Sequence, residues 1–511
     1  PLSFFCYYTD MVDNLMVESN AMEKIVSLCK RRGFIYPGSE IYGGVANTYD
    51  YGPLGSELLR NIRNEWWDNF VHKRTDIVGI EASLISHQEI WKASGHTTGF
   101  ADAMIDCKNC KLRMRADHLI EDYLDDPQNL PNIELWTKNL TIGGSGMKLT
   151  KDIVDKVVKT KRVEGLSLEQ LSEIIFLLGV KIVCPNCGKH EWTPVRKFNL
   201  LFPVNLGIVE GDQSLAYLRG ETAQGMFVNF RNVVDSTRVR LPFGIAQNGK
   251  SFRNEITPGN SVFRTLEFEQ GEIEYFFDPD SSDWEKLFED WKNEMWNFVT
   301  EKLGIKSDHL RWRTHSDEER SFYSRRTEDL EYKFPFGFKE LWGLAYRSDY
   351  DLKQHMKYSN VDLSINDSET GKKIIPHVIE PAVGINRMLL MILVDSYHED
   401  DKRVVLKLHP KLAPVKVAVF PLLANKLPLV KIAKDIYHGL KKQINGMIAF
   451  DDRGNIGKRY YSQDEIGTPF CVTVDFQSLE DKTVTIRYRD TAKQERVKID
   501  DLTPFITKKI V

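Results

Sequence analysis

A β-hairpin predicted over residues 251–276 carries side chains suited to nucleotide chemistry; its sequence is SFRNEITPGNSVFRTLEFEQGEIEYF. Arg253 belongs to the first strand. Arg264, Phe268 and Glu272 follow the turn at intervals of four, so a return strand of period two places them on one face. Arginines bind phosphate oxygens, aromatic rings stack on bases, and carboxylates accept ammonium groups. The alternative is a hairpin with ordinary cross-strand ion pairs. The combined spacing favours a site for a nucleotide and an amino acid.

A second segment, residues 379–393, has a form suited to phosphate binding. Its sequence, IEPAVGINRMLLMIL, predicts a strand, a tight bend at Gly384 and a helix that opens with Arg387. The amino end of a helix carries partial positive charge, so an arginine there can hold the terminal phosphate of a bent ATP. Taken alone, Arg387 could equally form a surface ion pair. The segment gains weight beside the hairpin.

Two C-x2-C pairs form a candidate metal site: Cys107 with Cys110, and Cys184 with Cys187. Four thiolates in two such knuckles are typical of structural zinc, which they enclose without an open position for catalysis. The long segment between the pairs makes the pattern less specific than that of a zinc finger. The alternative is four unligated thiols.

Residues 407–446 contain eight lysines and one acidic residue, Asp435, within a chain of net charge −4. Such a local surplus of positive charge is a plausible footprint for RNA. For lysines alone, a solvated helix face would be the usual interpretation. The pattern therefore needs support from the rest of the chain.

These groups must be positioned by several units of structure. A helix is predicted at Met22–Arg32, and a longer one from about Pro53, in which apolar residues recur every fourth position as far as Phe70. That stripe indicates core packing, although a subunit interface could share the face. Strands dominate residues 198–277, and strands alternate with helices from about Ala413. The expected units are an extension of uncertain origin (1–21), a first core part (22–106), an insertion with the cysteine pairs (107–190), a second core part (191–412) and a C-terminal domain (413–511).

Composition limits the class of protein. The chain has 511 residues, 42% of them hydrophobic, and no apolar run long enough to cross a bilayer. We therefore expect no membrane partner. Seven cysteines, an odd number, argue against a disulfide framework and favour the reducing cytoplasm.

The hairpin resembles motif 2 of class II aminoacyl-tRNA synthetases, and residues 379–393 resemble motif 3. Further stretches resemble bacterial-type glycyl-tRNA synthetases: SEIYGGVANTYDYGPLG (39–55), RADHLIED (115–122), YLRGETAQGMFVNF (217–230), FGFKELWGLA (336–345) and GNIGKRYYSQDEIGTPFCVT (454–473). The resemblance implies an α+β class II core, mainly an antiparallel sheet with flanking helices. It also implies a zinc-knuckle insertion and a C-terminal α/β anticodon-binding domain.

The resemblance also implies site residues. Arg253 and Arg387 would be catalytic, acting on the phosphates of ATP with Mg²⁺. ATP would be contacted by Arg253, Asn254, Glu255, Phe263, Arg264, Thr265, Leu266, Glu267, Phe268, Glu340, Leu341, Gly384, Ile385, Asn386 and Arg387. Glycine would be contacted by Arg115, Glu221, Phe268, Glu269, Gln270, Gly271, Glu272, Glu380 and Gly384.

The implied activity is glycine–tRNA ligase activity: ATP activates glycine to glycyl-adenylate, and glycine passes to the 3′ end of its tRNA. The implied partners are that tRNA and a second copy of the chain, in a homodimer formed around the 53–73 helix. Asp464 and Glu465 would read bases of the tRNA. Two rivals are a non-catalytic synthetase paralogue and an accessory subunit of a mitochondrial DNA polymerase. Either should have lost the arginines of motifs 2 and 3, which this chain keeps.

Four positions depart from the family pattern. Gly220 replaces a proline, Gly271 a methionine, Ala382 a serine and Asn386 an acidic residue. The glycines could loosen the backbone that aims two carboxylates, and loss of the serine removes a hydrogen bond worth ~0.5–1.5 kcal/mol. We therefore expect weaker binding of glycine without loss of function.

Overall fold

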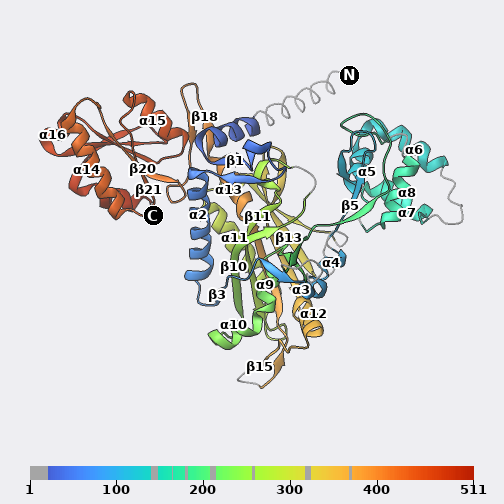
Figure 1. Cartoon of the computed structure of the whole chain (residues 1–511). Coiled ribbons are helices and arrows are strands. Elements are labelled where there is room, and N and C mark those ends of the chain that lie inside the picture. The colour runs from blue at the N-terminus through green and yellow to red at the C-terminus, as the bar shows by residue number, and fades with distance from the viewer. Residues whose placement is uncertain are drawn as a thin grey trace.

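The computed structural model describes residues 21–99, 101–139, 148–163, 165–178, 182–207, 214–255, 259–316, 324–366 and 371–510. A central body carries the insertion on one side and the C-terminal domain on the other (Figure 1). The expected extension, apart from residue 21, lies outside the described residues, as do residues 257 and 258 of the hairpin turn. Within the described ranges, no helix is long and apolar enough to cross a membrane.

A seven-stranded sheet organises the central body, in the order β12-β13-β14-β17-β11-β10-β3. All neighbouring pairs are antiparallel except β10 and β3, which confirms the mainly antiparallel core. The predicted hairpin is β10 and β11. The strands are β3 (Ile77–Gly79), β10 (Phe243–Phe252), β11 (Glu267–Phe277), β12 (Leu310–Thr314), β13 (Arg326–Phe334), β14 (Gly337–Ser348) and β17 (His377–Gly384).

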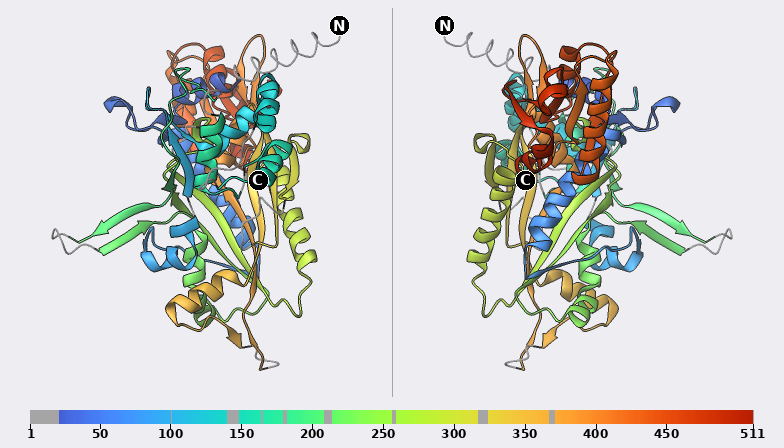
Figure 2. Two further views of the ribbon diagram at one scale, coloured as in Figure 1. Left: turned by 90° about the vertical axis from the view of Figure 1, so that its right-hand side faces the viewer. Right: turned by 90° about the vertical axis from the view of Figure 1, so that its left-hand side faces the viewer.

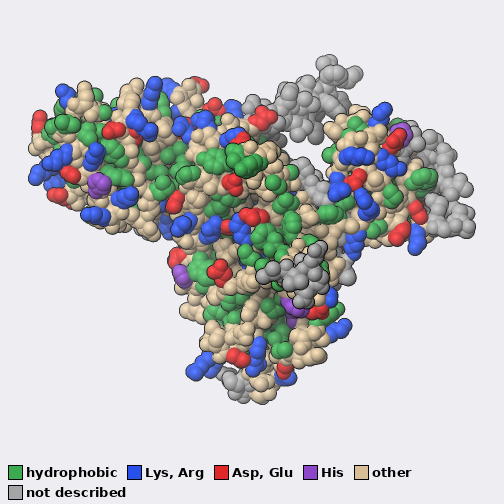
Figure 3. Space-filling model, in the orientation of Figure 1, with side chains coloured by type: hydrophobic (Ala, Val, Ile, Leu, Met, Phe, Trp, Pro, Cys, Tyr) green, Lys and Arg blue, Asp and Glu red, His purple; other side chains and the backbone are tan. Residues whose placement is uncertain are grey.

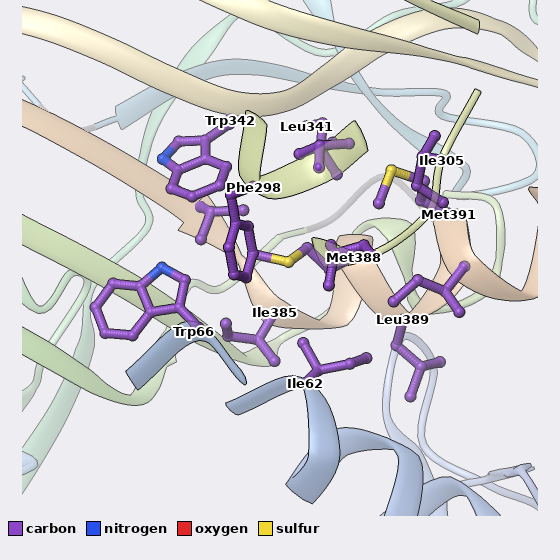
Figure 4. Close-up of a cluster of buried hydrophobic side chains, with 14 of the residues drawn as sticks. Ile62, Trp66, Phe298, Ile305, Leu341, Trp342, Ile385, Met388, Leu389 and Met391 are labelled. Carbon is purple, nitrogen blue, oxygen red and sulfur yellow. The ribbon is translucent and has the colours of Figure 1, made fainter. Parts of the chain in front are cut away.

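Strand alternation gives this sheet two different faces. One face packs on a large apolar core, part of which is drawn in Figure 4, with α2 (Pro53–Trp67), α11 (Trp284–Asn297) and α13 (Ile385–Ser396). The other face packs around Phe243 and Phe276 with α9 (Ala223–Val228), α10 (Phe230–Thr237) and α12 (Tyr350–Ser359). Polar residues of this second face, nearer the hairpin turn, are free of that packing and can form a site.

The predicted apolar stripe of α2 lies in the core. Leu58, Ile62, Trp66 and Phe70 are fully buried within the single chain. This confirms the core interpretation and shows that the stripe offers no surface to a second subunit. The helix begins at Pro53, as predicted, and continues into a π-helical turn over Asp68–His72.

Shorter elements surround the sheet. A helix covers residues 21–32. The segment 37–55 contains β2 (Tyr49–Tyr51), which pairs with β1 (Ile35–Pro37). The β8–β9 hairpin projects from the body (Figure 2). The other elements are α3 (Gln88–Ala93), α4 (His96–Gly99), β4 (Ile85–His87), β8 (Phe202–Leu206), β9 (Ser214–Leu218), β15 (Ile365–Asn366), β16 (Lys373–Ile374), β18 (Tyr397–Glu399) and β19 (Val404–Leu406).

The insertion is a small α+β unit with its own core. Its sheet has the order β6-β5-β7; the first cysteine pair lies between β5 and β6 in sequence, and the second pair precedes β7. The elements are β5 (Ala101–Asp106), β6 (Arg113–Arg115), β7 (Arg196–Asn199), α5 (Ala116–Asp125), α6 (Leu130–Asn139), α7 (Lys151–Thr160) and α8 (Leu168–Leu178).

The C-terminal domain is a five-stranded mixed sheet, ordered β21-β20-β22-β23-β24, with helices packed against it. The predicted alternation of strands and helices from about Ala413 is present, which confirms an α/β domain. The elements are β20 (Val415–Pro421), β21 (Met447–Phe450), β22 (Phe470–Val474), β23 (Thr483–Tyr488), β24 (Gln494–Lys498), α14 (Leu427–Gln443), α15 (Ile456–Glu465), α16 (Gln477–Asp481) and α17 (Leu502–Ile510).

Candidate active site

A pocket of about 310 Å³ opens on the sheet face opposite the α2–α13 core. Its walls come from the β10–β11 connection, from β13, β14 and β17, and from the start of α13. Two thirds of the residues singled out in the two sequence motifs reach it. The predicted residues that line it are Glu221, Arg253, Glu255, Phe263, Arg264, Thr265, Phe268, Gln270, Glu272, Glu340, Glu380, Gly384, Asn386 and Arg387.

Two arginines of the hairpin line one end of the pocket. Arg253 follows the last residue of β10; its Nε donates to the carbonyl oxygen of Gly220 at 3.0 Å, and its guanidinium lies 5.3 Å from the ring centroid of Phe268. Arg264 precedes β11 rather than lying on it, and its Nε is 4.0 Å from Glu255 Oε2. The expectation that Arg264, Phe268 and Glu272 share one strand face therefore holds only for Phe268 and Glu272. All three side chains nevertheless line the same pocket.

Arg387 lines the same end from the start of α13. Its Nη1 lies 2.9 Å from Glu340 Oε2, and its guanidinium lies 4.4 Å from the ring centroid of Phe263. The charge of Arg387 lowers the pKa of Glu340. Sequence reasoning missed Asp329, whose pKa is raised by burial and by Glu340, and whose Oδ2 lies 2.7 Å from Nε2 of His315. Both missed residues line the pocket.

The other end of the pocket is acidic. Glu221, Glu272 and Glu380, three of the residues predicted to contact glycine, reach it from three separate segments. Glu272 accepts a hydrogen bond from the hydroxyl of Thr222. His96 Nε2 lies 3.3 Å from Glu221 Oε2, and no sequence signal identified this histidine. An end lined by three carboxylates suits a ligand with a positive charge.

Arg347 supports this acidic end and was also missed from the sequence. Its Nη1 donates to Glu380, and its Nε and Nη2 donate to Asp351 at 2.9 and 3.0 Å. The amide of Gln224 donates to both Glu221 and Asp351 at 3.0 Å. The sequence did contain one signal for Arg347, because this arginine directly follows the mostly apolar run LWGLAY. An arginine in a buried strand normally has a buried acidic partner.

The carboxyl groups of the acidic end titrate differently. Burial, Glu380 and Glu221 raise the pKa of Glu272 to about 8. Burial also raises the pKa of Glu380, against the opposing charge of Arg347. Burial acts on Glu221 too, but the charges of His96 and Arg347 outweigh it and hold its pKa below the usual range. At neutral pH the free pocket therefore holds a proton on Glu272.

Several expected residues do not offer side chains to the pocket, and strand alternation is the reason. Glu269 and Gly271 point to the opposite face of β11, where Glu269 forms a salt bridge with Arg63 at 2.6 Å. Leu341 and Ile385 lie in the apolar core (Figure 4) and are fully buried there. These four residues therefore offer no side chain to the pocket, and their predicted contacts with ATP or glycine stay predictions.

Four other expected residues are held elsewhere. The backbone N–H groups of Asn254 and Leu266 are used in loop hydrogen bonds, and Glu267 forms an exposed ion pair on the hairpin. Arg115 lies in the insertion, where its Nε donates to Asp117 at 3.1 Å, and it does not line the pocket.

The departures from the family pattern have local explanations. A Cβ atom on Gly271 would lie 2.8 Å from Cε2 of Trp66, so the indole ring occupies the space that a longer side chain would need. Gly271 is therefore packed rather than loose. Gly220 contributes its backbone carbonyl oxygen to Arg253, and a proline at this position would have the same carbonyl group. Asn386 accepts from the N–H of Glu269 at 2.6 Å and so ties α13 to β11.

We expect the substitution Gly271→Met to lower the free energy of unfolding by about 1–3 kcal/mol, because it overpacks a filled core. Urea denaturation measures this change. The double variant Gly271→Met with Trp66→Leu should lose less stability than the sum of the losses of the two single variants. The reason is that leucine leaves room for the methionine side chain. Additive losses would contradict the proposed packing.

The four cysteines of the insertion come together. Their sulfur atoms all lie within 4.8 Å of one another, with Cys107 and Cys187 at 3.6 Å and Cys110 and Cys184 at 3.6 Å. A tetrahedral zinc with Zn–S bonds of about 2.3 Å requires sulfur atoms roughly 3.8 Å apart. The donor set and its geometry therefore fit one zinc ion.

Three residues of the C-terminal domain that were expected to face RNA are buried. Asp464 has no exposed surface, because Arg487 and Arg403 enclose its carboxylate at 2.8 and 2.6 Å, so it cannot read a base edge. Lys416 is buried, with its Nζ 3.1 Å from the carbonyl oxygen of Pro410. Glu465 is also nearly buried, and Arg32 holds it.

Six of the eight lysines of residues 407–446 remain exposed, and they belong to the C-terminal domain and its leading segment. Figure 3 shows basic side chains over that part of the visible face, among scattered acidic ones. The exposed lysines are Lys407, Lys426, Lys431, Lys434, Lys441 and Lys442.

Comparison with protein families finds three matches along the chain. Residues 102–200 match the glycyl-tRNA synthetase insertion domain 1. Residues 208–396 match the tRNA synthetase class II core domain of the G, H, P, S and T group. Residues 416–509 match the anticodon binding domain.

Full-length relatives are equally informative. A glycine–tRNA ligase of Clostridium tetani is 48% identical over 506 residues, covering 97% of this chain and 100% of the relative. A glycine–tRNA ligase of Clostridium acetobutylicum is 48% identical over 501 residues, with 97% and 100% covered. One from Caldanaerobacter subterraneus is 48% identical over 494 residues, with 96% and 98% covered.

Proposed function

Since this chain belongs to the glycine–tRNA ligase family of class II aminoacyl-tRNA synthetases, we propose that its pocket activates glycine with ATP and transfers it to tRNA. The observation that carries this proposal is one pocket with three arginines at one end and three glutamates at the other. The basic end suits the phosphates of ATP. The acidic end suits the ammonium group of an amino acid.

The reaction needs no protein nucleophile. The carboxylate of glycine attacks the α-phosphorus of ATP and pyrophosphate leaves; the terminal ribose hydroxyl of tRNA then attacks the glycyl carbonyl and AMP leaves. Arg253 holds the α-phosphate and Arg264 and Arg387 hold the departing pyrophosphate, so that charge developing between the two substrates meets fixed positive groups. Phe268 packs against the adenine base, replacing its contact with Arg253.

Glu221, Glu272 and Glu380 bind the ammonium group of glycine. Every other amino acid is larger, so a closely fitting acidic end rejects it sterically without a separate editing site. Ala382 lines this end where the family has a serine, and the weaker binding of glycine expected from that change stays a prediction.

Mg²⁺ fits the basic end. A Cβ atom added to Gly343 would lie 3.8 Å from Asp329 Oδ1 and 3.9 Å from Glu340 Oε1. Both carboxylates line the pocket, and the charge of Glu340 raises the pKa of Asp329. Hard oxygen ligands of this type, together with phosphate oxygens, are what Mg²⁺ prefers. Asp329 and Glu340 would hold the Mg²⁺ ion, and the bound ion would neutralise part of the negative charge of pyrophosphate.

The remaining units are assigned by the same reasoning. We propose that zinc in the four-cysteine cluster stabilises the insertion of residues 107–190, and that the exposed lysines of the 413–511 domain contact tRNA. The core comprises residues 22–106 and 191–412. A homodimer in the cytoplasm is part of the proposal; its interface must lie outside the buried stripe of α2.

Charging of tRNA tests the function. The protein with ATP, Mg²⁺, labelled glycine and total bacterial tRNA should produce label that is precipitated by acid and released by mild base. Labelled alanine and serine serve as controls and should remain unattached. Absence of glycine attachment to any tRNA would contradict the proposal.

The pH dependence of glycine binding follows from Glu272. Its pKa is raised to about 8 in the free pocket, while the ammonium group favours the ionised carboxylate, so binding releases a proton. The affinity for glycine should therefore rise with pH, by up to about tenfold per unit below the pKa. The affinity for glycine should stop rising once the pH exceeds the pKa of Glu272. Calorimetry between pH 6 and pH 8, in buffers of different ionisation enthalpy, measures both quantities. An affinity independent of pH, with no proton released, would refute this assignment.

A further inference from the structure

Glu274 lies beneath the acidic end of the pocket and is completely buried. It follows Glu272 by two residues on β11, so both project from the same face. In the β11–β17 register, Glu272 lies opposite Ala382 and Tyr275 opposite Ile379, which places Glu274 opposite Glu380. Glu274 does not line the pocket itself. Its side chain lies next to that of Glu272 on the same strand face, farther from the hairpin turn, and Glu272 does line the pocket.

No hydrogen-bond donor reaches either carboxyl oxygen of Glu274 from the described part of the chain. The charged groups that act on it are Glu380 on β17, Arg347 on β14 and Glu272 on its own strand. Its β10 neighbour, Ile245, is apolar. An ionised carboxylate without donors is very costly to bury, whereas a protonated one can donate to an acceptor.

We propose that Glu274 is a positioning residue that stays protonated and donates its O–H to the carboxylate of Glu380. Glu380 also accepts from Nη1 of Arg347. It is then held from two strands and directed at the ammonium group of glycine. This inference rests on the proposed function of the pocket as a glycine site.

The electrostatics of the site agree with this arrangement. Burial and the charge of Glu380 raise the pKa of Glu274 well above its usual range. The proton adds a donor to the acidic end without adding a negative charge. The charge presented to the ligand is then set by Glu221, Glu272 and Glu380 alone. A fourth buried charge would repel these carboxylates from one another.

Two substitutions separate positioning from packing. Glu274→Leu keeps the volume but removes the donor; it should raise the KM for glycine by roughly 10- to 100-fold, the range for a hydrogen bond to a charged group. The KM for ATP should change less than twofold. Glu274→Gln keeps an N–H donor in the same place and should restore the KM for glycine to within about threefold of the native value. Thermal unfolding checks that each variant is folded.

Infrared spectroscopy gives a direct readout that does not depend on activity. The spectrum of the native protein minus that of Glu274→Gln at pH 7 should contain the C=O band of a protonated carboxylic acid. Absence of this band, or a glutamine variant as impaired toward glycine as the leucine variant, overturns the proposal. Failure of the native protein itself to exchange pyrophosphate with glycine would instead overturn the proposed function.

Discussion

Replacement of Arg253 by alanine is expected to lower glycine-dependent ATP–pyrophosphate exchange by at least 10²–10³-fold, about 3–4 kcal/mol of transition-state stabilisation. The guanidinium is held by the carbonyl oxygen of Gly220 at the point where β10 ends, so it is positioned before ATP binds. Its loss removes the group proposed to meet charge on the α-phosphate. The loss should appear in kcat as well as in kcat/KM, because the interaction strengthens in the transition state.

The matched control is Arg231→Ala. Arg231 lies on α10 with half its side chain exposed, and it pairs with Asp235 at 2.9 Å, outside the pocket. Its replacement should leave exchange within about twofold of the native rate, since a surface pair contributes little. Equal losses in the two variants would mean that Arg253 acts through general stability rather than through the α-phosphate.

Removal of zinc is the second prediction with a large effect. The purified protein should contain one zinc ion per chain, and Cys107→Ser should abolish stoichiometric binding, because structural zinc sites contribute on the order of 10 kcal/mol to the folding of the units that hold them. The insertion should then become sensitive to limited proteolysis. Glycine-dependent exchange should persist, since no residue in the described part of the insertion lines the pocket.

Cys29→Ala is the control for that experiment. Cys29 is buried in the central core, away from the four-cysteine cluster. Its replacement should leave the zinc content at one ion per chain. Zinc analysis by atomic emission, together with thiol titration of the native protein, measures the effect. Native protein without zinc, with four readily titrated insertion thiols, would show that the cluster is not a metal site.

The sequence motifs located the pocket because its chemistry depends on residue types at short spacing. Arg253, Phe268 and Arg387 could be found in this way, and the family resemblance added Glu221 and Glu380. Their roles toward ligands remain predictions. The insertion, the antiparallel core and the α/β domain were also recognisable, and family comparison confirms these folds.

Residues that act across strands were missed. Arg347 and Asp329 reach the pocket from strands outside the two motifs, and only Arg347 carried a local signal, as an arginine directly after an apolar run. The predicted residues whose side chains do not reach the pocket miss it for one main reason. A motif read as a continuous run ignores strand alternation, which sends Glu269 to a salt bridge and Leu341 to the core. The prediction that Asp464 reads a base was wrong for a related reason. Its burial beside Arg487 and Arg403 cannot be recognised from a single sequence.

Pyrophosphate exchange measured with each of the twenty amino acids tests the central claim most directly. If the acidic end binds only the smallest amino acid and the three facing arginines hold ATP, exchange should be rapid with glycine and at least about 100-fold slower with alanine and serine. The same result should hold without tRNA, since both substrates bind in one pocket. Exchange with another amino acid at a rate equal to or above that with glycine, or none with glycine, would contradict the account.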